Sequence, residues 1–450
     1  MLVLPSSPLT VCYDRYSLTD VETDDPIPFW SILTRILIPV AQSTSQLIDA
    51  IDTIAVSLRG QTDSDMGFLR RFIDEKWDAD SFFQRTWPLC VEIALEMSAL
   101  FPNGQLEPLS SNNPTIECTS RQIACLVIHQ FLCTLPKLPW TTAGEEDNSA
   151  NLWIWYGSEQ PHPNAVNAYL TALFVFFERI DYGSVASHSI SLALHTAPHA
   201  QQPATDTWFT RIHITALDTP VVTAEFLGMP SGACVVSANK DIGFGRTASQ
   251  EMHVGCTPQA LPAKLVTQSL AEGEVMVLRG CAATIELSGY GRGATLGEII
   301  PAGAHDWATR TMLFMDALPL DGYHMAVVTP DLLPGHLERE LTKAFTAFAS
   351  YDNQARYATV VTGHWGCGAF GGNREIKSLI QWCAASMAGV QLNFVCENDS
   401  FSSDFRNFAD RALQSQWTVH SVFTTLRAMS ATDEGRQSAF RKVTQILKSL

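Results

Sequence analysis

A glycine-rich segment near residue 365 constrains the fold of this chain more than any other feature. Residues 357–381 read YATVVTGHWGCGAFGGNREIKSLIQ: a short β-branched run, five glycines among ten residues, and a helical pattern that Asn373 can cap. Glycines let the backbone approach an anion closely, and a helix N-terminus favours negative charge. The segment therefore suits a diphosphate, although a tight structural turn between a strand and a helix explains it equally well.

The second half of the chain alternates between short apolar runs and helical patterns. The expected strands are 189–194, 209–216, 233–238, 275–278, 312–316, 357–362 and 391–395, and the expected helices are 335–350, 373–387 and 402–413. This alternation predicts an α/β fold, a mixed sheet flanked by helices on both faces.

The first part of the chain, from about residue 28 to 182, has helical periodicity instead. The expected helices are 29–58, 80–101, 120–135 and 164–180. The last two are apolar nearly all round, which predicts burial inside a bundle. We therefore expect an N-terminal all-helical accessory region over 1–182 and an α/β domain over 183–450.

Composition narrows the classes of protein and partner. The net charge is −17, from 46 acidic and 29 basic residues. If the ligand is nucleotide-like, its phosphates must therefore be held by backbone N–H groups more than by a basic surface. The eleven cysteines include no C-x-x-C pair, which favours buried free thiols in a reducing compartment. We expect an intracellular protein that uses no metal or other cofactor, does not bind membranes and does not read nucleic-acid sequence directly.

The segment WGCGAFGG after a strand resembles the diphosphate-binding loop of the poly(ADP-ribose) glycohydrolase family, whose catalytic core is a macrodomain. Stretches around 120–140, 169–180, 308–318 and 337–348 extend the resemblance to roughly residues 80–400. It implies that the loop wraps a diphosphate and that Phe370 packs against the ribose beside the scissile bond. The diphosphate-binding residues implied are Gly366, Gly368, Ala369, Gly371 and Gly372. His364 stands where animal members usually have Asn, and we assign it no chemical role.

A second glycine segment, 233–256, resembles the family signature of an Asn, three glycines, a spacer and Gln-Glu-Glu. The resemblance assigns ribose contact to Asn239 and matches Gly243 and Gly245 to the outer glycines. It matches Gln250 and Glu251 to the Gln and the first Glu of the signature.

Three departures from the signature affect the chemistry. Met252 replaces the second Glu, the catalytic acid of the family, and a thioether cannot donate a proton. Phe244 replaces the middle glycine and could narrow the ribose pocket. The spacer is also about three residues shorter, which could rotate the helix start and bring Glu251 into the position of the acid.

The leading hypothesis is hydrolysis of poly(ADP-ribose) to ADP-ribose with Glu251 as the acid. The alternative is a catalytically impaired protein that binds ADP-ribose or poly(ADP-ribose), and a weaker one is a scaffold without either property. The resemblance implies poly(ADP-ribose) or ADP-ribosylated proteins as partners, a place in the DNA damage response, and residence in the nucleus, the cytoplasm or both.

Overall fold

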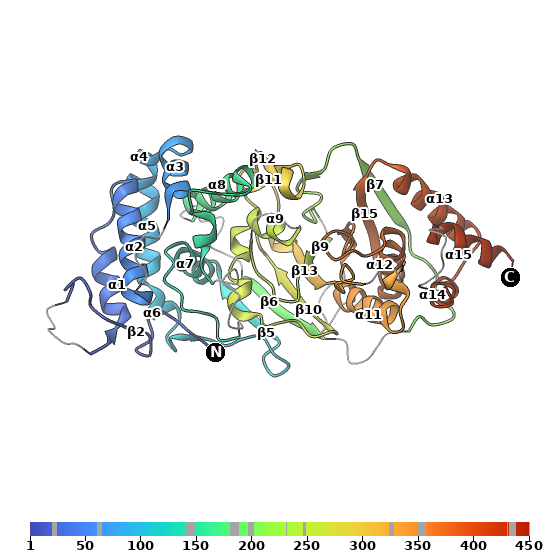
Figure 1. Ribbon diagram of the computed structural model, residues 1–450, viewed down its shortest axis with the longest axis horizontal. Coiled ribbons are helices and arrows are strands. Elements are labelled where there is room, and N and C mark those ends of the chain that lie inside the picture. The colour runs from blue at the N-terminus through green and yellow to red at the C-terminus, as the bar shows by residue number, and fades with distance from the viewer. Residues whose placement is uncertain are drawn as a thin grey trace.

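The computed structural model describes residues 1–19, 25–60, 65–140, 150–180, 189–196, 202–230, 232–245, 249–323, 328–349, 357–429, 431 and 438–449. The molecule is elongated, with the N-terminal helices at one end, the C-terminal helices at the other and a sheet between them (Figure 1). No helix within these ranges is both long and apolar enough to cross a bilayer.

An eight-stranded mixed sheet forms the centre, in the order β5-β6-β10-β13-β9-β14-β15-β7. The four strands from β9 to β7 are parallel to one another and to β13, whereas β10, β6 and β5 pair antiparallel. The strands are β5 (Thr115–Thr119), β6 (Ser189–Thr196), β7 (Ile212–Leu217), β9 (Gly232–Ala238), β10 (Glu274–Arg279), β13 (Thr311–Asp316), β14 (Thr359–Thr362) and β15 (Gln391–Glu397). All seven expected strands are present, and the mixed sheet flanked by helices confirms the expected fold class.

Alternate residues of the central strands enter two separate hydrophobic cores, because successive side chains point to opposite faces. In β9, Cys234 and Val236 pack with the N-terminal helices, whereas Ala233 and Val235 pack with the C-terminal ones. This double burial explains the continuous apolar run of β9.

The helices on the first face come mostly from the N-terminal region. They are α1 (Phe29–Leu37), α2 (Thr44–Arg59), α3 (Gly67–Lys76), α4 (Ala79–Ser81), α5 (Trp87–Leu95), α6 (Met97–Leu100), α7 (Ser120–Phe131), α8 (Pro163–Arg179), α9 (Ser249–Gly255) and α10 (Ala263–Val266), with a π-helical turn at Phe82–Thr86 and a 3₁₀ turn at Leu152–Trp155. The expected helix 29–58 is two helices, because Pro39 follows α1 and Ser43 caps the start of α2. One strand of the sheet, β5, also comes from this region, and the domain boundary near 182 stays a prediction because residues 181–188 lie outside the described ranges.

The second face is covered by helices from the C-terminal half. They are α11 (His336–Phe348), α12 (Arg374–Ala388), α13 (Ser400–Gln414), α14 (Val419–Arg427) and α15 (Ala439–Lys448). Smaller sheets join β8 (Val221–Val222), β11 (Ile285–Ser288) and β12 (Thr295–Ile299), β1 (Leu2–Val3) with β4 (Gln105–Leu106), and β2 (Val11–Cys12) with β3 (Ile27–Pro28).

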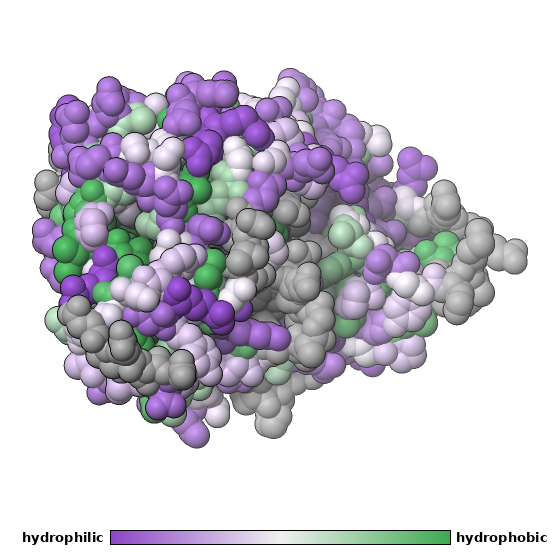
Figure 2. Space-filling view, turned by 60° about the vertical axis from the view of Figure 1, so that its left-hand side comes forward, coloured by the Kyte–Doolittle hydropathy of each residue, from purple (hydrophilic) through white to green (hydrophobic). Residues whose placement is uncertain are grey.

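Polar residues cover most of the face drawn in Figure 2, with smaller hydrophobic patches between them. All eleven cysteines are free thiols, ten of them buried and Cys367 half-buried. Burial raises the pKa of Cys367 to about 12, so this thiol stays protonated at neutral pH.

Candidate functional site

Both glycine segments lie at one edge of the sheet. Strands β9 and β14 are parallel neighbours, with Gly232 beside Thr359 and Cys234 beside Val361. The segments that follow them, Asn239 onward and Gly363 onward, therefore leave the sheet at the same carboxyl edge. In open α/β sheets this edge is where ligands bind.

The loop 363–372 is held in shape by hydrogen bonds between its own backbone groups. Gly372 N donates to Gly366 O at 2.9 Å, and Gly371 N donates to Gly368 O at 3.0 Å. Gly366 and Gly371 have φ of +72° and +69°, a left-handed conformation that L side chains rarely adopt. The glycines are therefore required by the turn itself.

Three consecutive N–H groups at the tip of this loop are available to a ligand. Within the described residues, the N–H groups of Gly368, Ala369 and Phe370 have no hydrogen-bond acceptor. Gly368 and Ala369 are exposed, and Phe370 is half-buried against the core. Successive free amides of this kind make an anion-binding concavity, so the arrangement fits a diphosphate.

The start of α12 contributes less to anion binding than its sequence suggested. The Asn373 side chain accepts hydrogen bonds from Glu375 N and Ile376 N, at 3.0 and 3.2 Å. Asn373 N itself donates to Asp331 Oδ2 at 3.0 Å. These donors are already satisfied, so a diphosphate on the loop would depend on the amides of 368–370.

A buried lysine supports the loop from below. Lys377 is fully buried, and its Cε lies 2.6 Å from the place that a Cβ on Gly372 would occupy. Its Nζ pairs with Glu340, lies 3.8 Å from Asp331 Oδ1 and sits 5.0 Å from the centre of the Trp365 ring. The loop therefore rests on an ammonium group whose charge is balanced inside the protein.

The carboxylate of Glu340 belongs to a wider ion cluster at the end of β13. Glu340 also pairs with Arg339 at 2.6 Å, and Arg339 pairs with Asp316, the last residue of β13. Lys343 Nζ lies 2.7 Å from Asp316 Oδ1. Together with Lys377 and Asp331, the cluster contains three cations and three carboxylates, so its formal charges balance.

The second segment begins with an exposed turn. Asn239 directly follows β9, is exposed, and its Oδ1 accepts a hydrogen bond from Asp241 N at 3.1 Å. Gly243 is buried, and a Cβ there would lie 3.1 Å from Nζ of the buried Lys264. The spacer residues 246–248 lie outside the described ranges.

Phe244 is buried and points into the protein. Its ring is 5.7 Å from the Trp155 ring and 5.0 Å from Lys264 Nζ, with only 5% of the residue exposed. Trp155 also fixes the turn directly, because its Nε1 donates to Gly245 O at 2.8 Å. The Phe244 side chain is therefore an anchor beneath the loop, and its effect on a ribose pocket stays a prediction.

Glu251 and Met252 occupy different environments in the first turns of α9. Glu251 is half-buried, and a Cβ on Gly245 would lie 3.1 Å from its Cγ and 3.2 Å from its Oε1. Met252 is fully buried, and its Sδ accepts a hydrogen bond from Gly291 N at 3.1 Å. Adjacent helix residues point about 100° apart, so only Glu251 faces the glycine turn.

Two further residues of the segments are largely withdrawn from solvent. Gln250 is 5% exposed, and its Oε1 has no hydrogen-bond partner among the described residues. The His364 ring packs edge-on against Phe394 and Phe401, and both ring nitrogens lack a partner in the same ranges. Burial, aided by Arg374, lowers the pKa of His364 to about 4, which leaves it neutral at physiological pH.

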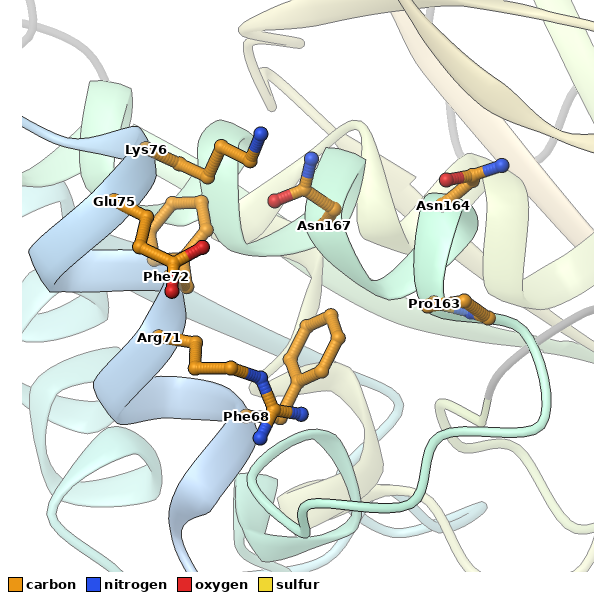
Figure 3. Close-up of a pocket in the computed structure, with 8 residues that line it drawn as sticks. All are labelled: Phe68, Arg71, Phe72, Glu75, Lys76, Pro163, Asn164 and Asn167. Atoms are coloured by element: carbon orange, nitrogen blue, oxygen red, sulfur yellow. The ribbon is translucent and has the colours of Figure 1, made fainter.

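A separate pocket of about 170 Å³ lies between α3 and the start of α8 (Figure 3). It contains none of the expected site residues; its lining consists of Phe68, Arg71, Phe72, Glu75, Lys76, Pro163, Asn164 and Asn167. The described part of the chain also holds no group of three or more His, Cys, Asp or Glu side chains placed to bind a metal ion.

Two family models match this chain. The macrodomain-fold part of poly(ADP-ribose) glycohydrolase matches residues 213–403, and the helical domain of the same family matches residues 75–193, together well over half of the sequence. The chain belongs to the poly(ADP-ribose) glycohydrolase family.

The relatives are distant. Poly(ADP-ribose) glycohydrolase 1 of Caenorhabditis elegans is 24% identical over 204 residues, covering 42% of this chain and 26% of the relative. Poly(ADP-ribose) glycohydrolase 2 of the same organism is 26% identical over 178 residues, covering 36% of each chain. The chain thus spans about a quarter to a third of the length of these curated relatives.

Among solved structures, a poly(ADP-ribose) glycohydrolase mutant from Deinococcus radiodurans in complex with ADP-ribose is similar, with 16% identity and a TM-score of 0.29. The match covers 49% of this chain and 93% of the chain of the Deinococcus radiodurans protein.

Sequence analysis of this divergent family member missed the residues that support the two segments. Trp155 and Tyr169 come from the helical region, and the Tyr169 ring packs 5.6 Å from that of Trp155. Lys264 and Lys377 are buried cations. The apolar pattern of its helix predicts that Tyr169 is buried, but not which residues it packs against, because packing between distant segments leaves no local pattern in the sequence. A lysine in an otherwise apolar helical stretch, as at 377, was the one available signal.

Proposed function

We propose that this protein hydrolyses the ribose–ribose bonds of poly(ADP-ribose) and releases ADP-ribose, with Glu251 as the acid. The observation that supports this most is the side chain of Glu251, a half-buried carboxyl directly against Gly245 in the turn that the family uses for the ribose. Asn239 and the free amides of 368–370 lie in segments that follow two neighbouring parallel strands, at the same edge of the sheet. This placement suits one ligand that contacts Asn239 with its ribose and the amides with its diphosphate.

The reaction needs one carboxyl group in two protonation states. Protonated Glu251 gives its proton to the departing ribose oxygen as the glycosidic bond breaks, through an oxocarbenium-like transition state. The resulting carboxylate takes a proton from the water that attacks the anomeric carbon, which restores the acid. No metal or redox group is required by this sequence of steps.

The experiment measures ADP-ribose released from poly(ADP-ribose) by the purified protein and by Glu251→Gln. Loss of a positioned acid is expected to lower the rate by about 10²–10⁴-fold. The control is Glu298→Gln, an exposed carboxyl on β12. Release that persists in Glu251→Gln contradicts the role of this residue, and no release by the unchanged protein contradicts hydrolysis.

A second function is favoured by one specific observation. Met252, at the position of the family's catalytic acid, is fully buried and hydrogen-bonded to Gly291. A protein that binds ADP-ribose or poly(ADP-ribose) without cleaving it would tolerate this change. Calorimetry of the unchanged protein with ADP-ribose, showing binding without any release, would establish this function.

The proposal extends to partners and location. Poly(ADP-ribose) and ADP-ribosylated proteins are the expected partners, without direct sequence-specific nucleic-acid binding, and the expected setting is the DNA damage response in the nucleus, the cytoplasm or both. Imaging of the tagged protein before and after DNA damage tests this, and exclusive residence in another compartment contradicts it.

A further inference from the structure

A tryptophan of the helical region contacts the glycine turn beside Glu251. Trp155 is the last residue of the 3₁₀ turn Leu152–Trp155, within the residues that match the helical domain of the family. The side chain is buried, and its Nε1 donates a hydrogen bond to Gly245 O at 2.8 Å. The helical region is therefore joined directly to the segment that contains Glu251.

The 3₁₀ turn that carries Trp155 is itself held by hydrogen bonds on both sides. Asn151, before the turn, donates from Nδ2 to Leu135 O at 2.8 Å and accepts at Oδ1 from Leu135 N at 3.1 Å. Tyr156, after the turn, donates from its hydroxyl to Phe131 O at 2.7 Å. Phe131 is the last residue of α7, so the indole projects from a support that is fixed to this helix.

The indole of Trp155 contacts two consecutive residues of the glycine turn. Its ring lies 5.7 Å from the ring of the buried Phe244, and its N–H binds the carbonyl of Gly245. The ring of Tyr169 on α8 lies 5.6 Å from the same indole. Ring packing limits how near the turn can approach. The N–H also fixes the direction of the Gly245 carbonyl, because a hydrogen bond weakens steeply when its angle is distorted.

Gly245 is also the residue against which the Glu251 side chain packs. A Cβ on Gly245 would lie 3.1 Å from Glu251 Cγ and 3.2 Å from its Oε1. The residue that Trp155 holds is thus the one that borders the carboxyl group. A displacement of Gly245 would change where this carboxyl can lie, and a misplacement of about 1 Å can cost a catalytic group about 100-fold in rate.

We propose that Trp155 is a positioning residue for Glu251: its indole N–H holds the Gly245 carbonyl and so keeps the glycine turn against the acid. This inference rests on the proposed role of Glu251. It makes the helical region a part of the catalytic arrangement, since the support of the turn comes from outside the macrodomain part of the chain.

The first experiment compares the kinetics of two tryptophan variants. Trp155→Phe keeps an aromatic ring and removes the N–H that binds Gly245. The matched control is Trp87→Phe, because Trp87 is equally buried and its Nε1 has no hydrogen-bond partner among the described residues. In Trp155→Phe we expect kcat for the release of ADP-ribose to fall roughly ten-fold with little change in KM. An equal fall in both variants, or a change in KM alone, overturns the proposal.

A double-mutant cycle separates this role from general support of the fold. If Trp155 acts through Glu251, loss of the indole N–H has no further effect once the carboxyl is gone. Glu251→Gln and the double variant Trp155→Phe/Glu251→Gln should therefore release ADP-ribose at the same residual rate. Effects that multiply would show that the two residues act independently, which contradicts a positioning role.

A spectroscopic measurement needs no turnover. In the NMR spectrum of protein with ¹⁵N-labelled tryptophan, the Trp155 indole signal is assigned by its absence in Trp155→Phe or Trp155→Tyr. Glu251→Gln should shift this signal through Gly245 and leave the Trp87 signal in place. An unshifted Trp155 signal overturns the proposal. Failure of the unchanged protein to release ADP-ribose refutes the proposed function instead, and the indole signal still decides whether Trp155 and Glu251 are coupled.

Discussion

Met252 Sδ accepts a hydrogen bond from Gly291 N at 3.1 Å, and the contact joins α9 to the turn after β11. The methionine side chain is fully buried in the core shared with the N-terminal helices. Position 252 is therefore a packing position in this protein. Glu251, the preceding residue in the chain, lies against the glycine turn instead.

Restoring the family residue at position 252 is expected to harm the protein. Met252→Glu places a carboxyl in a fully buried, apolar site, so the free energy of unfolding should fall by about 3 kcal/mol or more without any gain in ADP-ribose release. Met252→Leu keeps the volume and should cost less than about 1.5 kcal/mol. Chemical denaturation and the release assay check both; a stable and faster Met252→Glu protein would show that this position faces the substrate.

Substitutions at two glycines of the loop should affect ligand binding and protein stability separately. A Cβ on Gly368 meets nothing within 4 Å, so Gly368→Ala should fold normally but weaken ADP-ribose binding by partly covering the free amides. A Cβ on Gly372 would lie 2.7 Å from Gly366 O, so Gly372→Ala should lower the melting temperature by several degrees. Calorimetric titration and thermal unfolding measure the two effects. Equal ADP-ribose affinity in Gly368→Ala would argue against diphosphate binding at this tip.

The buried Lys377 under the loop should contribute far more to the stability of the protein than the exposed Arg374 nearby. Lys377→Met leaves Asp331 without an ion-pair partner among the described residues, whereas Glu340 keeps Arg339. The free energy of unfolding should therefore fall by about 3–5 kcal/mol. Arg374→Ala removes two exposed ion pairs and should cost about 0–1 kcal/mol. Urea unfolding compares them, and similar losses in both variants would show that the cluster is not tightly coupled.

Acid should destabilise the protein through its buried histidines. Burial lowers the pKa of His129 to about 4 from its usual 6.5, so the unfolded chain binds more protons between these values. Keeping His129 neutral therefore costs the folded protein nothing above pH 6.5, whereas its free energy of unfolding falls by on the order of 3 kcal/mol as the pH drops from 6.5 to 4. His129→Gln should reduce the slope of unfolding free energy against pH in this window, with exposed His213→Gln as the control. An unchanged slope in His129→Gln would place the acid sensitivity elsewhere.

The strands and the glycine loops could be predicted because each depends on residues close together in the chain. The run Gly232–Ala238 is apolar at every position facing either core, and Asn373 caps α12 with its own side chain. The division of 29–58 into two helices was missed although Pro39 carried the signal. The short strands β8, β11 and β12 were missed for two reasons. Strand β8 pairs with β11, which lies more than 60 residues further along the chain, and the pairing of β11 with β12 is interrupted by a shift in register.

The sequence by itself determined the order of elements, the two glycine segments and the identity of the residues in them. Periodicity and glycine placement are local properties, and a parallel sheet then brings the two loops to one edge. Only the tertiary structure decided that Phe244 is an anchor, that Met252 is core and that Glu251 faces the turn, since these follow from contacts with Trp155, Lys264 and Gly291. The direction of a side chain depends on which distant surface fills the space beside it, and a linear pattern does not contain that information.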